Sequence, residues 1–181
     1  MKTLKIILSS IALMLLLFNG SCKNDNPINQ DDNEIITNSK LNNRNVDING
    51  DNKIDYQFLY FSGASSSSSW VGLYVHCLDS NEVQNSSISG TLPIEENAVI
   101  SDSCEWDINS ESIAGATDNG SYWSGPFVSD SSKYLGIRLY KEGEYYYGYL
   151  KILISHKGVL TIVDSVYSTI ANQQIHAGFR P

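Results

Sequence analysis

The chain has 181 residues, 41% of them hydrophobic, and carries a formal net charge of −8 from 12 Lys and Arg against 20 Asp and Glu. This length and apolar content are enough for one domain with a proper core. The acidic charge repels phosphate backbones and anionic lipid headgroups, so it excludes nucleic acid as the expected partner.

The N-terminus has the pattern of a secretory signal that ends in a lipid-attachment cysteine. Two lysines and the apolar run Ile6–Phe18 are followed by the small pair Gly20-Ser21 and then by Cys22. The run is shorter than the roughly 17–25 residues that span a bilayer, so we expect residues 1–21 to be removed. The mature protein would then begin at an acylated Cys22, and its acyl chains would hold it on a membrane.

The segment that follows predicts a flexible tether over residues 22–45. It is rich in Asn and Asp and has few large apolar side chains. Such a segment cannot bury enough surface to offset the entropy lost on ordering. We therefore expect the folded domain to cover residues 46–181, separated from the lipid by this tether.

The chain beyond the tether is typical of a β protein. Alternation places Leu135, Ile137 and Leu139 on one face of a strand, and short polar turns separate such runs, as in an antiparallel meander. The fold class predicted is all-β, an antiparallel β-sandwich, with an open β-barrel as the alternative. Strands are expected at Ile54–Phe61, Trp70–Leu78, Ala98–Ser101, Tyr134–Tyr140, Tyr145–Ile154 and Val159–Tyr167.

The first turn of the domain is a candidate calcium loop. Asp47, Asn49, Asp51 and Asp55 supply side-chain oxygens at loop positions 1, 3, 5 and 9, and Lys53 supplies a backbone carbonyl. A tight loop with this spacing directs several hard oxygens at one Ca²⁺. The bidentate Glu of an EF-hand is missing, so we expect a short loop with a structural ion. The alternative is an ordinary Asn-Gly hairpin turn with solvated acids.

The cysteines predict one disulfide. If Cys22 carries lipid, Cys77 and Cys104 remain, and an even remainder in an exported chain favours pairing. The alternative is two free thiols, either buried or too far apart to bridge.

A run of tyrosines is a candidate ligand surface. Tyr145, Tyr147 and Tyr149 share one face of a predicted strand and could form a stacking platform for sugar rings. The alternative is that these rings pack against neighbouring strands or segments.

Catalytic patterns do not rise above chance. His76, His156 and His176 are the only histidines, and no Gly-x-Ser-x-Gly elbow accompanies the many serines. The acidic pairs Glu95-Glu96 and Glu105/Asp107 are ordinary for an acidic surface. The sequence therefore favours a non-catalytic domain.

Two stretches carry a family resemblance. The signal with its terminal Cys22 resembles lipoproteins of the Bacteroidetes type, and VDINGDNKIDYQF (46–58) resembles the D-x-N-G-D-G-x-x-D opening of uncharacterised surface β domains of that group. The closing residues 146–178 are also similar, with Tyr149 where Trp is usual and Asn52 in the opening where Gly is usual. The resemblance implies export and a β fold and carries no activity.

These observations together predict a lipid-anchored protein of the cell envelope, at the outer membrane and exposed at the surface. Its expected role is binding or interaction without catalysis, with a glycan or a protein as ligand. A glycan-directed hydrolase and a purely structural envelope component are the alternatives.

Overall fold

The computed structural model describes residues 42–66, 68–86, 89–109, 111–117 and 120–181. The predicted signal, Cys22 and most of the tether lie outside these residues. In the described part, no helix is long and apolar enough to cross a membrane. The regular structure there consists of β-strands, so the predicted all-β class is confirmed.

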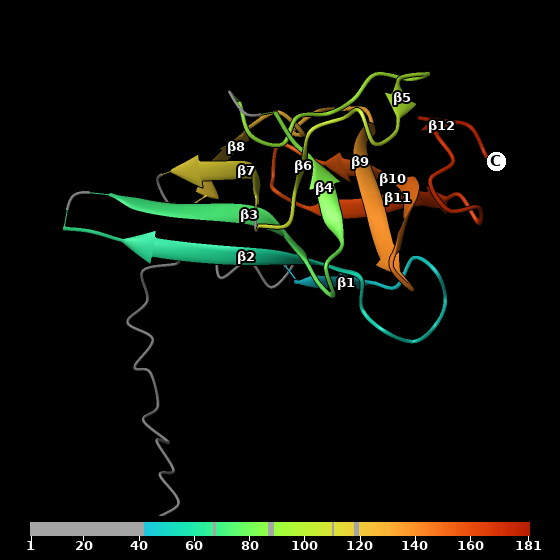
Figure 1. The fold of residues 1–181 in the computed structure, drawn as a ribbon. Helices are drawn as coiled ribbons and strands as arrows, with labels where there is room; N and C mark the ends of the chain where they lie inside the picture. Colours follow the sequence, from blue (N-terminus) through green and yellow to red (C-terminus); the bar gives the residue numbers. More distant parts are fainter. Residues whose placement is uncertain (1–41, 67, 87–88, 110, 118–119) are drawn as a thin grey trace, which may run out of the picture. The chain divides into compact units, whose positions relative to one another are not determined.

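Two five-stranded sheets make up the domain (Figure 1). The first sheet contains, in spatial order, β1 (Arg44–Val46), β2 (Tyr56–Ala64), β3 (Ser69–Cys77), β7 (Glu111–Thr117) and β8 (Tyr122–Ser124). The second contains β11 (Leu160–Tyr167), β10 (Glu144–Ile154), β9 (Lys133–Lys141), β4 (Glu82–Gln84) and β6 (Trp106–Asp107). A small third sheet pairs β12 (Ile175–His176) with β5 (Val99–Ile100).

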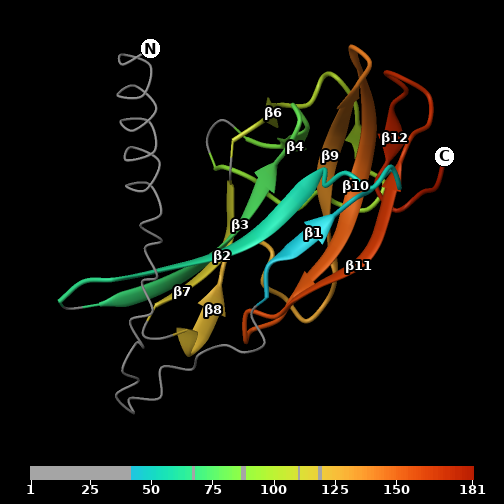
Figure 2. The ribbon, with the colours of Figure 1, turned by 90° about the horizontal axis from the view of Figure 1, so that it is seen from below.

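Neighbouring strands within each sheet are antiparallel. The two large sheets are separate in their strand order, and seen from below their strands run at a marked angle to one another (Figure 2). The fold is therefore the predicted antiparallel sandwich rather than the barrel.

The predicted strands are confirmed, and the structure adds others. The predicted meander becomes β9, β10 and β11, joined by turns at 142–143 and 155–159. Strand β1 begins at Arg44, two residues before the expected domain start, because residues 44–46 pair with Tyr56–Phe58 of β2. The sequence analysis missed β4, β6, β7, β8 and β12, which are short or rich in small residues.

The main core lies between the two large sheets. Alternate residues of β9, such as Leu135 and Ile137, are fully buried there, and Leu73 and Val75 of β3 face them from the first sheet. The two-residue period thus sends one face of each strand inward, as the sequence predicted.

A second core cluster covers the opposite face of the second sheet. It contains Tyr147 and Tyr149 of β10 together with Ile100 of β5 and Ile175 of β12. The second sheet is therefore buried on both faces, which explains the nearly continuous apolar sequence of β10.

Two tyrosines of β2 hydrogen-bond across the main core to the second sheet. The fully buried Tyr56 hydroxyl lies 2.8 Å from the carbonyl oxygen of Arg138 on β9 and 3.1 Å from that of Glu82 on β4. The Tyr60 hydroxyl donates to the Gly158 carbonyl (2.7 Å) and accepts from the Leu160 N–H (3.3 Å). These bonds fix how the sheets sit on each other, because a buried hydroxyl must find its partners.

Removing the Tyr56 hydroxyl should destabilise the fold without altering its shape. Tyr56→Phe leaves carbonyl oxygens without their buried donor, which costs about 1–3 kcal/mol in free energy of unfolding. Urea denaturation measures this. The matched control is Tyr122→Phe, since Tyr122 is 66% exposed, and it should change stability by less than about 0.5 kcal/mol. Equal stabilities of the two variants would contradict the role given to the Tyr56 hydroxyl.

Candidate functional site

Side chains of the Asp47–Asp55 loop accept hydrogen bonds from the loop's own backbone and hold it in a tight turn. Asp47 accepts hydrogen bonds from the N–H groups of Gly50 (2.7 Å) and Asn52 (2.8 Å), and Asn49 and Asp51 each accept from the N–H group two residues later. Gly50 and Asn52 have positive φ angles of 75° and 67°. The local turn is the one expected from the sequence, with Asn replacing Gly at the second left-handed position.

The last acid of the loop points toward the second sheet. Asp55 is 6% exposed and accepts hydrogen bonds from the Ile48 N–H (2.8 Å) and the Asn81 amide (3.3 Å). Burial raises the pKa of its carboxyl, and the negative charges of Asp51 and Asp47 raise it further. Among the described residues, no three His, Cys, Asp or Glu side chains gather closely enough to hold a metal ion.

A small cavity adjoins this loop. It has a volume of about 210 Å³ and is bordered by Asn49 and Asp55 on one side and by tyrosines of the second sheet on the other. The remaining lining residues are Leu139, Tyr140, Lys141, Tyr146, Tyr167 and Thr169.

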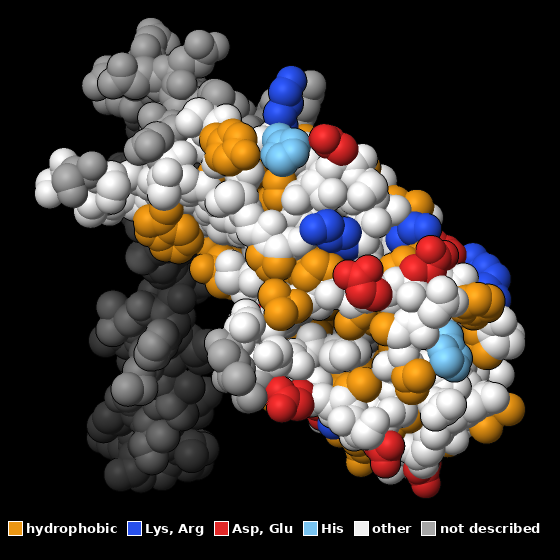
Figure 3. Space-filling view, turned by 90° about the horizontal axis from the view of Figure 1, so that it is seen from above, with side chains coloured by type: hydrophobic (Ala, Val, Ile, Leu, Met, Phe, Trp, Pro, Cys, Tyr) orange, Lys and Arg blue, Asp and Glu red, His pale blue; other side chains and the backbone are white. Residues whose placement is uncertain are grey.

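A larger open groove lies on the outer face of the first sheet. Its volume is about 400 Å³, and β3, β7 and β8 supply most of its lining. The lining residues are Trp70, Val71, Gly72, Tyr74, Ser112, Gly115, Ala116, Thr117, Ser121, Tyr122 and Ser124. None of these residues carries a charge. In Figure 3, at the left of the view, hydrophobic side chains border a stretch of uncharged surface, and the charged side chains lie outside that stretch.

The strand register explains the floor and walls of this groove. Gly72 of β3 pairs with Gly115 of β7, so two residues without side chains lie next to each other in its floor. Trp70 pairs with Thr117, which in turn pairs with Tyr122 of β8. Thr117 therefore lies between two aromatic residues, one on each neighbouring strand. The result is a shallow depression with aromatic walls, whose floor includes Gly115 and the Tyr74 ring that lies over Gly72.

Glycines also position the aromatic rings. A Cβ at Gly63 would lie 2.6 Å from the indole nitrogen of Trp70, and one at Gly72 would lie 2.7 Å from the Tyr74 ring. Each ring therefore covers a glycine, as aromatic residues often do on sheets. Phe61 of β2 packs edge-on against Tyr74, with centroids 5.5 Å apart. These contacts hold the rings close to the sheet.

Several of these aromatic side chains stay exposed. Trp70 is 45%, Phe61 49% and Tyr122 66% exposed. Behind Tyr122, the His156 ring stacks at 6.0 Å between centroids and 21° between planes. The β10–β11 turn thus supports one wall of the groove.

The structure does not present the predicted tyrosine platform. Tyr147 and Tyr149 are 1% and 2% exposed, because the segments around β5, β6 and β12 cover them. Tyr147 stacks on Trp106 (5.8 Å between centroids), and Tyr149 meets Tyr134 edge-on (5.3 Å). This burial corrects the proposal that they stack on a ligand and agrees with the packing alternative.

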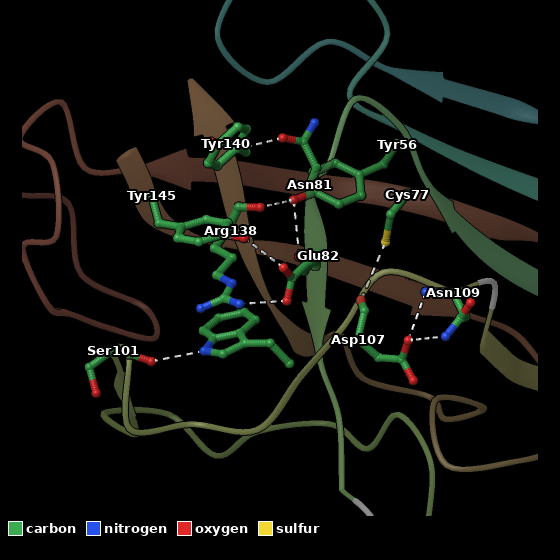
Figure 4. Close-up of polar contacts among 11 residues, drawn as sticks. Tyr56, Cys77, Asn81, Glu82, Ser101, Asp107, Asn109, Arg138, Tyr140 and Tyr145 are labelled. Atoms are coloured by element: carbon green, nitrogen blue, oxygen red, sulfur yellow. Dashed lines mark hydrogen bonds and ion pairs between the residues drawn. The ribbon is translucent and has the colours of Figure 1, made fainter. Parts of the chain in front are cut away.

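Tyr145 belongs to a cluster around a largely buried ion pair (Figure 4). Arg138 Nη2 lies 2.6 Å from Glu82 Oε2, and the Tyr145 hydroxyl donates to Glu82 Oε1 at 2.8 Å. The guanidinium carbon lies 3.8 Å from the Tyr145 ring centroid and 4.8 Å from that of Trp106. The arginine is thus sandwiched between two aromatic rings. This cluster fastens the short strands β4 and β6 to β9 and β10.

The predicted Cys77–Cys104 disulfide is not formed in the structure, where both residues are free thiols. Cys77 projects from β3 into the core, and its Sγ lies 3.8 Å from the Asp107 carbonyl oxygen (Figure 4). The Cys104 Sγ lies 3.6 Å from the Val99 carbonyl oxygen, in the loop after β5. Each sulfur is thus held by a different part of the backbone. This corrects the pairing expected from cysteine count alone.

A carboxyl pair that the sequence analysis did not single out lies beside Cys77. Asn85 Nδ2 is 3.2 Å from Asp107 Oδ2 and 3.5 Å from Glu111 Oε1. Burial and the neighbouring Asp107 raise the pKa of Glu111, while hydrogen bonds from Asn109 lower that of Asp107. Both carboxyl groups thus face the same amide nitrogen of Asn85, and neither residue lines the two cavities described above.

The histidines serve separate parts of the fold. His76 lies on β3, and the His156 Nε2 is 3.7 Å from Asp130 Oδ1. The His176 Nδ1 lies 3.0 Å from the carbonyl oxygen of Asn97. These placements do not bring any two of the histidines into one site.

Comparisons with known proteins found no matching family model, no matching curated protein and no matching solved structure. The function is therefore inferred from this chain's own residues and their arrangement.

Alkylation tests the state of the two thiols. Burial raises the pKa of Cys77 to about 12, so in native protein at pH 8 it should resist iodoacetamide, which reacts with the thiolate. Cys104, which is half-buried, should react without reductant, and both should react in denaturant. Mass spectrometry of tryptic peptides reports each site. If both cysteines in denatured protein react only after reductant is added, they form a disulfide, and the assignment of two free thiols is wrong.

Proposed function

We propose that this chain is a non-catalytic binding domain that a lipid on Cys22 holds in the cell envelope. The observation that carries the binding role is the open groove on the first sheet, with its exposed aromatic walls. The N-terminal signal pattern supports the anchor. At this level of the proposal, the ligand is a glycan or a protein.

Exposed aromatic residues gathered on one sheet face support binding. Burying a large aromatic side chain stabilises a fold, so a monomer gains nothing by leaving a cluster of them in water. Here Phe61, Trp70 and Tyr122 lie on three strands of one sheet and remain about half exposed or more. Such patches typically mark ligand or partner sites.

The alternative functions have weaker support. A glycan-directed hydrolase needs two separated carboxyl groups at a cleft, and Asp107 and Glu111 line neither of the two cavities described above. A purely structural envelope component does not account for the exposed groove. The net charge of −8 continues to disfavour nucleic acid.

The proposed cellular location of the protein follows from its lipid anchor. We propose that the protein belongs with the Bacteroidetes-type surface lipoproteins that its signal and its opening loop resemble. Its place would then be the outer membrane, with the binding domain exposed at the surface.

Substitution of the lipid-bearing residue tests the anchor. Cys22→Ala should abolish incorporation of a clickable palmitate and move the protein from the membrane fraction to the soluble fraction. Cys104→Ala is the matched control and should keep label and location. Equal labelling of wild type and Cys22→Ala would contradict the anchor.

We also propose that the Asp47–Asp55 loop binds one structural Ca²⁺ through Asp47, Asn49, Asp51, Asp55 and the Lys53 carbonyl. The donor set is entirely oxygen, which suits Ca²⁺. Among the described residues the three carboxyl groups do not converge on one point, so ion binding would require the loop to close further around them. Bound ion would offset the repulsion among the three carboxylates. Its role would be to stiffen the connection from β1 to β2.

Thermal melting tests this ion. Ca²⁺ at a hundredfold excess over its Kd would stabilise the fold by about 2.7 kcal/mol, so Tm should rise with Ca²⁺ and fall with chelator. Asp47→Asn/Asp51→Asn removes two charges and replaces one of the two accepting oxygens of Asp47 by an amide donor, so its starting Tm should be lower than that of the wild type. That Tm should ignore both additions. If wild-type Tm also ignores Ca²⁺ and chelator, the loop is only a hairpin turn.

A further inference from the structure

We infer that the groove on β3, β7 and β8 binds an uncharged glycan chain. The inference rests on the proposed binding function and names the class of its ligand.

The lining of the groove favours an uncharged ligand. The chain has 12 basic and 20 acidic residues, yet none of the groove's lining residues carries a charge. Charged ligands are recognised by complementary charge, which also speeds their association. An anionic polysaccharide or a charged peptide would find no such partner in this lining.

The walls of the groove suit the faces of sugar rings. The C–H groups on a pyranose face are apolar and weakly positive, and they stack on the negative face of an aromatic ring. Trp70 and Tyr122 are separated by the β7 strand, so their backbones lie about 10 Å apart. This spacing leaves room for one sugar ring at each aromatic wall, with the chain passing over Thr117.

The floor of the groove suits the hydroxyl groups of a glycan. Ser112, Ser121 and Ser124 line it with hydroxyls, which both donate and accept hydrogen bonds. Gly115 has no side chain, so a ligand can approach the β7 backbone closely there, while the Tyr74 ring covers the neighbouring Gly72.

The size of the groove favours a glycan over a protein. About 400 Å³ lies within the range of pockets for small ligands, roughly 300–1,000 Å³. A stable protein interface would need about 800 Å² on each partner, with charged or polar groups around its rim.

The groove can be blocked without disturbing the fold. A Cβ at Gly115 would lie 3.4 Å from the Val71 carbonyl oxygen, which is an ordinary contact, and Gly115 does not have a positive φ. Gly115→Thr should therefore fold normally, since Thr favours strands, while its side chain fills the floor. Trp70→Ala and Tyr122→Ala remove the walls. Phe179→Ala is the matched control, because Phe179 is 58% exposed and does not line the groove.

The experiment uses the full-length lipoprotein, purified in detergent, in affinity electrophoresis and calorimetry. The neutral probes are soluble mannan, xylan, β-glucan and starch, and the anionic probes are polygalacturonate and heparin. We expect at least one neutral polysaccharide to bind. Gly115→Thr, Trp70→Ala and Tyr122→Ala should each weaken binding at least tenfold, with Tm unchanged for Gly115→Thr, and Phe179→Ala should bind as wild type does.

Three results would overturn the inference. The first is binding of anionic probes only, and the second is neutral-glycan binding that the groove variants do not weaken. The third is an absence of glycan binding. In that case, a photo-crosslinking amino acid is placed at position 121, in place of Ser121, and the protein is irradiated on intact cells. This experiment distinguishes a groove that binds a protein from a groove that binds nothing. A crosslinked protein that Trp70→Ala abolishes would leave the proposed binding function standing with a protein ligand, and no crosslink would overturn the binding function as well.

Discussion

The arrangement of this domain depends on the hydroxyl groups that β2 sends across the core. Tyr56 reaches carbonyl oxygens of β4 and β9. Tyr60 donates to the Gly158 carbonyl in the β10–β11 turn and accepts from the Leu160 N–H at the start of β11. Apolar packing between sheets is roughly proportional to area and tolerates sliding, whereas these bonds have defined partners. They therefore set the angle and register at which the two sheets meet.

This fixed packing divides the surface into covered and open faces. The second sheet is buried on one side by the first sheet and on the other by the segments that carry β5 and β12, together with Trp106 of its own edge strand β6. The Arg138–Glu82 pair, held between Trp106 and Tyr145, fastens that outer cover. Among the described residues, no comparable segment covers Trp70 and Tyr122 on the outer face of the first sheet. This open aromatic face is the one to which we assign the proposed binding.

The sequence predicted the sandwich because its long strands alternate cleanly. Leu135, Ile137 and Leu139 lie inward as expected. Strand β7 escaped prediction because ESIAGAT lacks large β-forming side chains. Burial of Tyr147 and Tyr149 depends on distant segments that fold over them, which strand periodicity does not report. The groove was equally hidden, since it arises from the register of β3, β7 and β8 and from glycines that let aromatic rings lie close to the sheet.

The stacking of His156 on Tyr122 links the two halves of the sandwich at the groove itself. Strand β8 has three residues, and it contacts the β10–β11 turn through this stack and through the Trp123 N–H, 3.4 Å from the His156 carbonyl oxygen. Beside it, the buried Trp123 ring covers Gly158 of the same turn so closely that a Cβ there would lie 2.1 Å from the indole. The Tyr122 wall of the groove is thus held in place by the β10–β11 turn of the second sheet. Substitutions in that turn would shift the Tyr122 wall and so change the width of the groove without changing any residue that lines it. If the groove binds as proposed, its selectivity would change in the same way.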